Sequence, residues 1–294
     1  MGQILRRLQE VDGEFHWEEM VVPRSCASEA RKTRAPTRRK SAQFPDLTKL
    51  PPELSLCVLS YLNPTDLCLA ACIWDGLAND EVLWMRQCVS SWRCVTIYNH
   101  CRFIPGFSYK QLFMLLDEAS VTFNAEPEMG MEYLHQKNLV ANDPLEIARF
   151  LHTTKRLRAL KKREFLNQRR DVLEKLIELQ SYENIFLPNA LRQFFGEISA
   201  PTERGSYLED MIDRFSDRFC ACNPQLGLQK DTVYVLCFSL IMLSVDLCSP
   251  HVKNKMSKRE FIRNTRQAAH GVNDDLAGHL YDNIYLVGHV ATEV

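Results

Sequence analysis

The sequence predicts an all-α protein, and three observations carry this prediction. Glycine and proline number only 11 and 13 among 294 residues, so few positions interrupt a helix. Apolar residues recur at helical spacing along most of the chain, and no segment shows the alternation that is typical of strands. The sequence also indicates where helices begin, because Asp143 precedes Pro144 and the residues from Ser257 to Glu260 form a capping-box sequence.

The first predicted helices lie between residues 50 and 84. One apolar stripe on the first of them consists of Leu54, Val58, Leu59 and Leu62. Asn63 ends this helix and caps the next one, with Pro64 at its first helical position. So short a unit cannot bury this many Leu, Ile and Trp side chains by itself, which predicts a partner protein. Spacing alone does not separate its core positions from a surface that faces this partner.

The second half of the chain reads as a string of helices. Pro188 begins one that runs through Phe195. The stretch Val233–Leu247 is apolar nearly all round, which predicts a central helix of a bundle. The same stretch is shorter than a membrane span, so no transmembrane helix is expected here. It also carries three polar residues, Ser239, Ser244 and Asp246.

The composition and motifs of the sequence limit which cellular compartment and which kinds of activity are expected. A net charge of −1 argues against a generally basic surface that coats nucleic acid. The chain shows no secretory signal, so its 11 cysteines are interpreted as reduced thiols of a cytoplasmic protein, with the nucleus as the alternative. Neither a phosphate-binding loop nor a nucleophile-elbow or H-E-x-x-H motif is present. Cys220 and Cys222 have no second closely spaced pair, and we expect neither a metal nor a cofactor.

Two segments are strongly basic. Between Arg24 and Lys40 there are seven basic residues and one acid, Glu29, so residues 1–43 are predicted to form a disordered tail. Eight more basic residues lie between Lys155 and Arg170. We interpret this second run as a solvated helical face, with contact to an anionic membrane or an acidic partner as the alternative. Nucleic acid is not expected as a partner, because no aromatic residues alternate with these charges.

The segment around residues 50–84 resembles an F-box. The resemblance rests on the LPPEL opening, the LSYL and DLCLAA helices and the LANDEVLW close. F-boxes dock substrate receptors onto the Skp adaptor of cullin-based ubiquitin ligases, so the resemblance implies the Skp adaptor and the cullin ligase core as partners. The residues assigned to adaptor binding are Leu50, Pro51, Pro52, Leu54, Leu59, Leu62 and Trp84.

The second half resembles the Sec-seven (Sec7) domain of Arf guanine-nucleotide exchange factors. Four stretches carry this resemblance in family order: FNAEPEMGMEYL with DPLEIARFL, NALRQFF, RFCACNP, and VYVLCFSLIMLSVDLCSPHVKNK followed by EFIRNTR. The family implies a right-handed helical bundle with an apolar groove that grips an Arf-type GTPase. A glutamate on a loop then enters the nucleotide site, where its charge lies near the β-phosphate and destabilises bound GDP.

Carried onto this sequence, the exchange glutamate falls at Glu203. The family motif around it is altered, because Thr202 replaces a glycine and Ala200 replaces a leucine, and one extra residue follows. Smaller apolar contacts predict weaker GTPase binding. The residues assigned to the Arf groove are Ile198, Pro201, Met242, Ser244 and Ser249.

These observations define four segments and three hypotheses. The expected segments are a basic tail at 1–43, an F-box at 44–90, a connecting region at 91–118 and a Sec7-type domain at 119–290. The first hypothesis is a substrate receptor of a cullin-based ubiquitin ligase that recruits an Arf-family GTPase. The alternatives are an active Arf exchange factor, and a scaffold that sequesters Arf without catalysis. In each case, membrane association would come through the GTPase partner.

Overall fold

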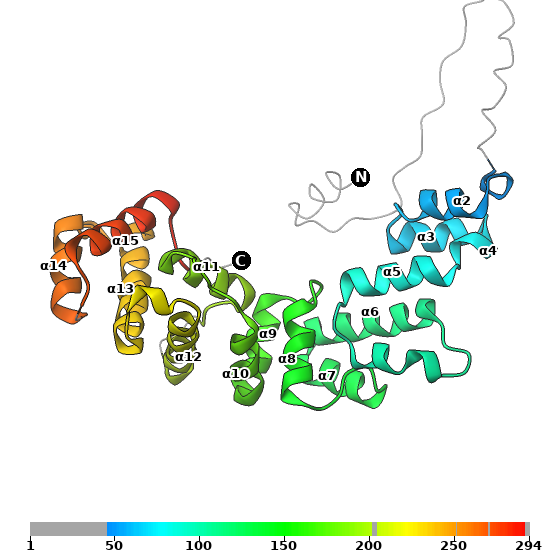
Figure 1. The fold of residues 1–294 in the computed structure, drawn as a ribbon, viewed down its shortest axis with the longest axis horizontal. Helices are drawn as coiled ribbons and strands as arrows, with labels where there is room; N and C mark the ends of the chain where they lie inside the picture. The colour runs from blue at the N-terminus through cyan, green and yellow to red at the C-terminus, as the bar shows by residue number, and fades with distance from the viewer. Residues whose placement is uncertain (1–45, 202–204, 251, 270, 292–294) are drawn as a thin grey trace, which may run out of the picture. The chain divides into compact units, whose positions relative to one another are not determined.

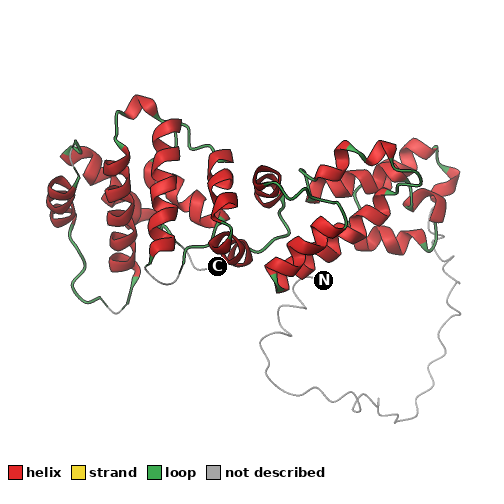
Figure 2. Ribbon diagram, turned by 90° about the horizontal axis from the view of Figure 1, so that it is seen from below, coloured by secondary structure: helices red, strands yellow, loops and turns green. Residues whose placement is uncertain are grey.

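The computed structural model describes residues 46–201, 205–250, 252–269 and 271–291. Within these ranges every regular element is a helix, which confirms the predicted all-α class (Figures 1 and 2). Leu47–Val294 form one compact unit by their internal contacts. The predicted basic tail at 1–43 lies outside the described residues.

The front of this unit is a cluster of short helices. They are the 3-10 helix η1 (Leu47–Lys49), α2 (Pro52–Leu59), α3 (Pro64–Ala71), α4 (Asp75–Ala78) and α5 (Glu81–Ser91). The predicted cap is confirmed, because the Asn63 side chain accepts a hydrogen bond from the backbone N–H of Asp66 at the start of α3. Ser55 ties α2 to η1 through a 2.7 Å hydrogen bond from its hydroxyl to the Leu47 carbonyl. Side-chain caps thus set the starts of α3 and α5, which Asn63 and Asp80 cap.

Helix α5 is joined to α6 (Tyr109–Ala125) by side-chain contacts that we call the α5–α6 junction. Two further 3-10 helices, η2 (Thr96–Asn99) and η3 (Cys101–Phe103), lie between them in sequence. The Glu81 carboxylate accepts hydrogen bonds from the Ser108 hydroxyl at 2.9 Å and the Tyr109 backbone N–H at 2.6 Å, so it caps α6. Behind this cap, the Phe113 ring packs edge-on against Trp84 and Trp92, with ring centroids 5.4 and 5.2 Å apart.

The remaining helices follow in short order. They are α7 (Pro127–Gln136), α8 (Pro144–Thr153), α9 (Ala159–Gln168), α10 (Arg170–Leu179), α11 (Leu187–Glu197), α12 (Ser206–Cys222), η4 (Pro224–Leu226), α13 (Lys230–Cys248), α14 (Lys258–Ala268) and α15 (Asp274–Val287). Neighbours pair as α6 with α7, α8 with α10, α12 with α13 and α14 with α15. The predicted caps at Asp143 and Ser257 are both confirmed, and Ser257 forms a complete capping box with Glu260.

Helix α13 occupies the centre of the C-terminal group, as its apolar sequence predicts. It packs against α11, α12, α14 and α15. Val233, Leu236 and Leu240 on this helix are fully buried. The helix that contains this stretch has 19 residues and, by length and composition alone, is long and apolar enough to cross a membrane, a test that core helices also pass. The contacts with four helices cover one part of its apolar surface, whereas Met242 and Val245 remain exposed.

Gly130 allows the close crossing of α6 and α7. A Cβ atom at this position would collide with the backbone of Phe123 on α6. No larger residue fits here without moving one of the two helices. The crossing therefore depends on the absence of a side chain at one position of α7.

Candidate functional site

The front helices leave an apolar surface uncovered. Leu54 on α2 is 55% exposed, and its helical neighbours at spacings of four and seven, Val58 and Tyr61, are exposed as well. We name Leu50, Leu54, Val58 and Tyr61 the α2 stripe. Leu69 and Ile73 are exposed at the same helical spacing on α3 and beyond it. Large apolar side chains gathered on a small folded unit are typical of a protein-binding surface.

Two of the residues assigned to adaptor binding belong to the core instead. Leu59 is 1% exposed and Trp84 is 0% exposed. The Trp84 indole N–H donates to the Ala78 carbonyl at 3.0 Å, and its ring packs on Phe113. In this structure both side chains pack the helices on one another, and their part in adaptor binding stays a prediction.

The other assigned residues lie nearer to solvent. Leu50, Pro51, Pro52 and Leu54 are exposed, and Leu62 is half-buried against the core. Tyr61, Leu69 and Ile73 were missed by the sequence prediction. The spacing from Leu54 to Val58 to Tyr61 indicates the outer face of α2. The sequence prediction instead included Leu59, which lies on the inner face.

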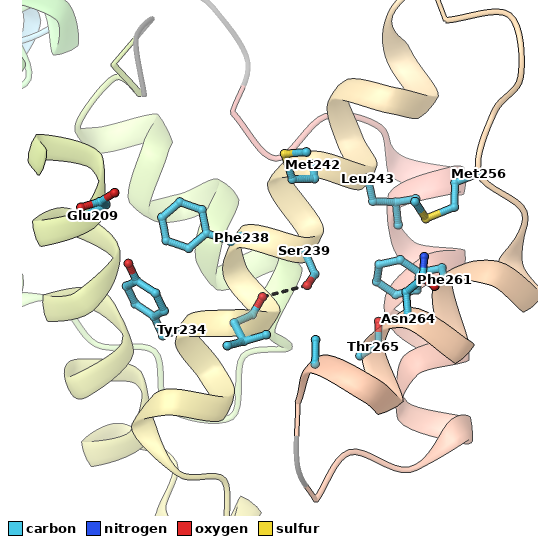
Figure 3. A pocket seen from close by; sticks show the side chains of 12 residues that line it. Glu209, Tyr234, Phe238, Ser239, Met242, Leu243, Met256, Phe261, Asn264 and Thr265 are labelled. Carbon is cyan, nitrogen blue, oxygen red and sulfur yellow. Dashed lines mark hydrogen bonds between the residues drawn. The ribbon is translucent and has the colours of Figure 1, made fainter. Parts of the chain in front are cut away.

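A second candidate site is an apolar cavity of about 510 Å³ between α12, α13 and α14, which we name the α13 groove. Tyr234, Phe238 and Met242 line it from α13 at successive spacings of four. Figure 3 shows Phe261, Asn264 and Thr265 entering from α14, and Glu209 facing the groove from α12. The Tyr234 and Phe238 rings touch, with centroids 4.9 Å apart. Helical spacing on α13 therefore builds one continuous apolar wall.

The polar groups of the α13 groove are few. Glu209 is the only charged residue that lines it among the described residues. Partial burial, with the nearby charge of Glu209, raises the pKa of the Tyr234 hydroxyl. The Ser239 hydroxyl is satisfied by the Val235 carbonyl at 2.8 Å. By contrast, the buried Thr265 hydroxyl has no hydrogen-bond partner within the described residues.

The structure divides the residues assigned to the Arf groove. Met242 is 47% exposed and lines the α13 groove. Ile198 and Ser244 are fully buried, and the Ser244 hydroxyl donates to the Ile241 carbonyl at 2.9 Å. Both face the packed core in this structure and do not line the α13 groove, so their part in GTPase binding stays a prediction. Pro201 and Ser249 are half-buried and do not line the cavity.

The assigned exchange glutamate, Glu203, lies outside the described residues. Before it, the Glu197 carboxylate at the end of α11 contacts the His152 ring nitrogen Nδ1 at 2.7 Å and the Gln180 amide at 2.9 Å. The hydrogen bond to Glu197 raises the pKa of His152. The Arg163 guanidinium also donates to the Ala200 carbonyl. These contacts anchor the segment that leads toward Glu203 onto α8 and α9.

After Glu203, the start of α12 is also held by basic side chains. The Tyr207 hydroxyl donates to the Arg163 carbonyl at 3.3 Å, and the Arg170 guanidinium lies 4.1 Å above the Tyr207 ring. Both flanks of the assigned site therefore rest on side chains or backbone of the basic segment Lys155–Arg170.

Most of the charges in that basic segment have partners. The ion pairs are Arg156 with Asp117, Lys161 with Glu164, Arg169 with Asp171 and Arg170 with Asp210. Lys162 is buried, and burial lowers its pKa. Exposed basic residues such as Lys155 and Arg158 remain for an external partner. Contact with an anionic membrane stays a prediction, with few free charges to support it.

The thiols of Cys88, Cys220 and Cys237 have pKa values raised by burial. Each of these cysteines is free, and burial raises the pKa of the Cys88 thiol to about 12. A nucleophilic cysteine requires the opposite shift. Among the described residues there is also no group of three or more His, Cys, Asp or Glu side chains positioned to hold a metal ion.

Comparison with known proteins finds both domain types. The Sec7 domain profile matches residues 114–286, and the F-box-like profile matches residues 47–90. F-box only protein 8 of Mus musculus is 58% identical over 260 residues, which cover 86% of this chain and 81% of that protein. Cytohesin-2 of Mus musculus is 34% identical over 168 residues, or 55% of this chain and 42% of that protein.

A solved structure supports the helical fold of the second half. The crystal structure of the Sec7p catalytic domain is 28% identical and matches with a TM-score of 0.54. The match covers 58% of this chain and 93% of that one. The helices that build the α13 groove lie within the range matched by the Sec7 profile.

Proposed function

Because this chain belongs to the Sec7 domain family and combines that domain with an F-box-like segment, we propose that it is a substrate receptor of a cullin-based ubiquitin ligase. The observation that carries this proposal is the α2 stripe. It is exposed although the helices beneath it have a fully packed core of Leu59, Leu67 and Trp84. A folded unit that leaves Leu, Val and Tyr uncovered on one helix face is suited to a helical partner such as the Skp adaptor.

Co-purification with the Skp adaptor tests this docking. The double variant Leu54→Asp plus Val58→Asp places two charges on the stripe without touching the core. Burying each side chain contributes about 1.5–3 kcal/mol, so adaptor affinity is expected to fall by about a hundredfold or more.

A matched control is Val121→Asp on α6. Val121 is 65% exposed and lies outside the F-box-like range, so this variant should bind the adaptor normally. Circular dichroism of both variants checks that they fold. If the double variant is folded and still co-purifies with the adaptor, the docking proposal is wrong.

The second part of the proposal is that the α13 groove binds an Arf-family GTPase as the recruited substrate. The groove is apolar, open at its Met242 side and built by helices of the Sec7 family. Met242→Asp places a charge on its wall and should weaken GTPase binding by about tenfold or more. Met114→Asp is the control, because Met114 is similarly exposed on α6 and lies outside the groove. Equal GTPase affinity for both variants would contradict this role of the groove.

Exchange activity is the alternative function, and the residue that favours it is Glu203. The assay is release of labelled GDP from an Arf protein in the presence of wild type or Glu203→Lys. An exchange factor accelerates release, and the lysine variant does not. If both proteins leave release at its spontaneous rate, the ligase-receptor function stands without exchange.

A third candidate is a scaffold that sequesters Arf. Depletion of this chain from cells distinguishes the scaffold function from the ligase-receptor function. A receptor predicts that Arf ubiquitination falls on depletion, whereas a scaffold predicts no change.

A further inference from the structure

A cavity of about 420 Å³ lies on a different side of α13 from the α13 groove, and we name it the end pocket. It shares no lining residue with that groove. Its walls come from the start of α11, the end of α12, η4, α13 and α15. The main apolar residues of these walls are Phe186, Leu187, Phe219, Leu236, Leu276 and Leu280. The volume falls within the range of roughly 300–1,000 Å³ that is usual for small-molecule sites.

Carboxamide groups mark one edge of the end pocket. Asn223 is buried, and its amide donates to the Tyr182 and Phe219 carbonyls at 2.9 and 3.0 Å. Its oxygen accepts from the Asn184 backbone N–H at 2.9 Å, which holds Asn184 in the left-handed region at a φ of 57°. The edge is therefore a fixed turn.

Gln225 offers the adjustable polar group at this edge. Its side-chain N–H₂ lies 3.3 Å from the side-chain oxygens of both Asn184 and Asn223, which is long for a hydrogen bond. Because Gln225 is exposed, its amide can turn toward a ligand at little cost. The end pocket thus offers an amide donor beside an apolar chamber.

The lining of the end pocket contains no acidic or basic residue among the described ones. A charged ligand would lose its hydration here without finding an opposite charge. We propose that the end pocket binds an uncharged small molecule with a medium-length aliphatic chain and a hydroxyl or carbonyl at one end. The chain would lie against Phe186, Leu226 and Leu276, which line the pocket and remain partly accessible, and the polar end would meet the Gln225 amide.

Fluorescence of the neutral probe N-phenyl-1-naphthylamine in the presence of the full chain tests this proposal. Leu276→Trp fills the end pocket and should weaken probe binding about tenfold or more. Met242→Trp inserts the same side chain into the α13 groove and should leave binding unchanged. Loss of binding in Met242→Trp but not in Leu276→Trp would place the probe in the α13 groove and overturn the proposal.

Competition at the same site tests the chemical class. Decanol should displace the probe, whereas decanoate at neutral pH should displace it about tenfold less well, because its carboxylate finds no counter-charge. Equal displacement by the two would contradict an uncharged ligand. If Leu276→Trp fails to fold, Leu226→Arg gives the same test from an exposed position on the wall of the pocket.

Other occupants give different outcomes. If a second copy of the chain covers the end pocket, sedimentation will show a dimer that Leu276→Trp dissociates. If residues 1–45 fill it, the full chain will not take up the probe, and Leu226→Arg will not change this. Either result rules out the small-molecule site.

Discussion

Phe113 links the front helices to the rest of the fold, and its truncation to alanine is expected to destabilise both. The ring is buried between Trp84 and Trp92, with centroid distances of 5.4 and 5.2 Å. The Arg156 guanidinium lies 5.2 Å from the centroid of the Phe113 ring. Removing a buried phenylalanine costs about 3–5 kcal/mol through lost transfer energy and the cavity that remains. This loss is a large share of the roughly 5–15 kcal/mol that stabilises a typical domain.

Urea unfolding of Phe113→Ala measures this effect. Tryptophan fluorescence reports on the junction through Trp84 and Trp92, and far-ultraviolet circular dichroism reports on all helices. Both signals should shift to a lower midpoint together, because the two groups of helices share one core. Met114→Ala is the control, since Met114 is exposed on the same helix and its truncation should change stability by about 0.5 kcal/mol or less.

Two outcomes would refute this reasoning. One is a loss smaller than about 1.5 kcal/mol, which would mean that the site collapses around the missing ring. The other is a split into two transitions with different midpoints, which would mean that the front helices unfold independently of α6.

Gly130→Ala should lower the melting temperature at a cost of about 3 kcal/mol, because its Cβ meets the backbone of Phe123, whereas Gly196→Ala has open space and should not destabilise. Asn63→Ala removes the cap of α3 and should cost about 1 kcal/mol in urea unfolding, and an unchanged midpoint would show that the cap contributes nothing. The raised pKa of His152 means that its hydrogen bond with a carboxylate stabilises the fold fully below pH 6.5, and that this contribution disappears as pH rises through the raised value. The difference in melting temperature between wild type and His152→Gln should therefore be largest in acid, and a constant difference across pH would contradict the assigned pair.

Structural features that depend on residues within one helical turn were predicted from the sequence. The caps at Asn63, Asp143 and Ser257 appear as expected, because a capping side chain needs only its own helix to form. The all-α class followed for the same reason, since helical spacing and caps repeat along the chain.

The direction in which a helix face points was harder to predict. Leu54 and Leu59 belong to the same apolar stretch, yet one is exposed and the other is buried. Which face is covered depends on the packing of α2 against η1 and α4, and the spacing within α2 does not show on which side those elements lie. On α13 the helix is apolar nearly all round, so periodicity could not separate Met242 at the groove from Ser244 in the core.

The α5–α6 junction bears on how this protein is cut for laboratory work. The Sec7 profile match begins at residue 114, directly after Phe113. An expression fragment trimmed to that match would discard Phe113 itself, the two indole rings around it and the carboxylate at the head of α6. Such a fragment begins inside a shared core, so poor yield or aggregation of the trimmed protein would reflect a misplaced boundary rather than an inherently unstable Sec7 domain.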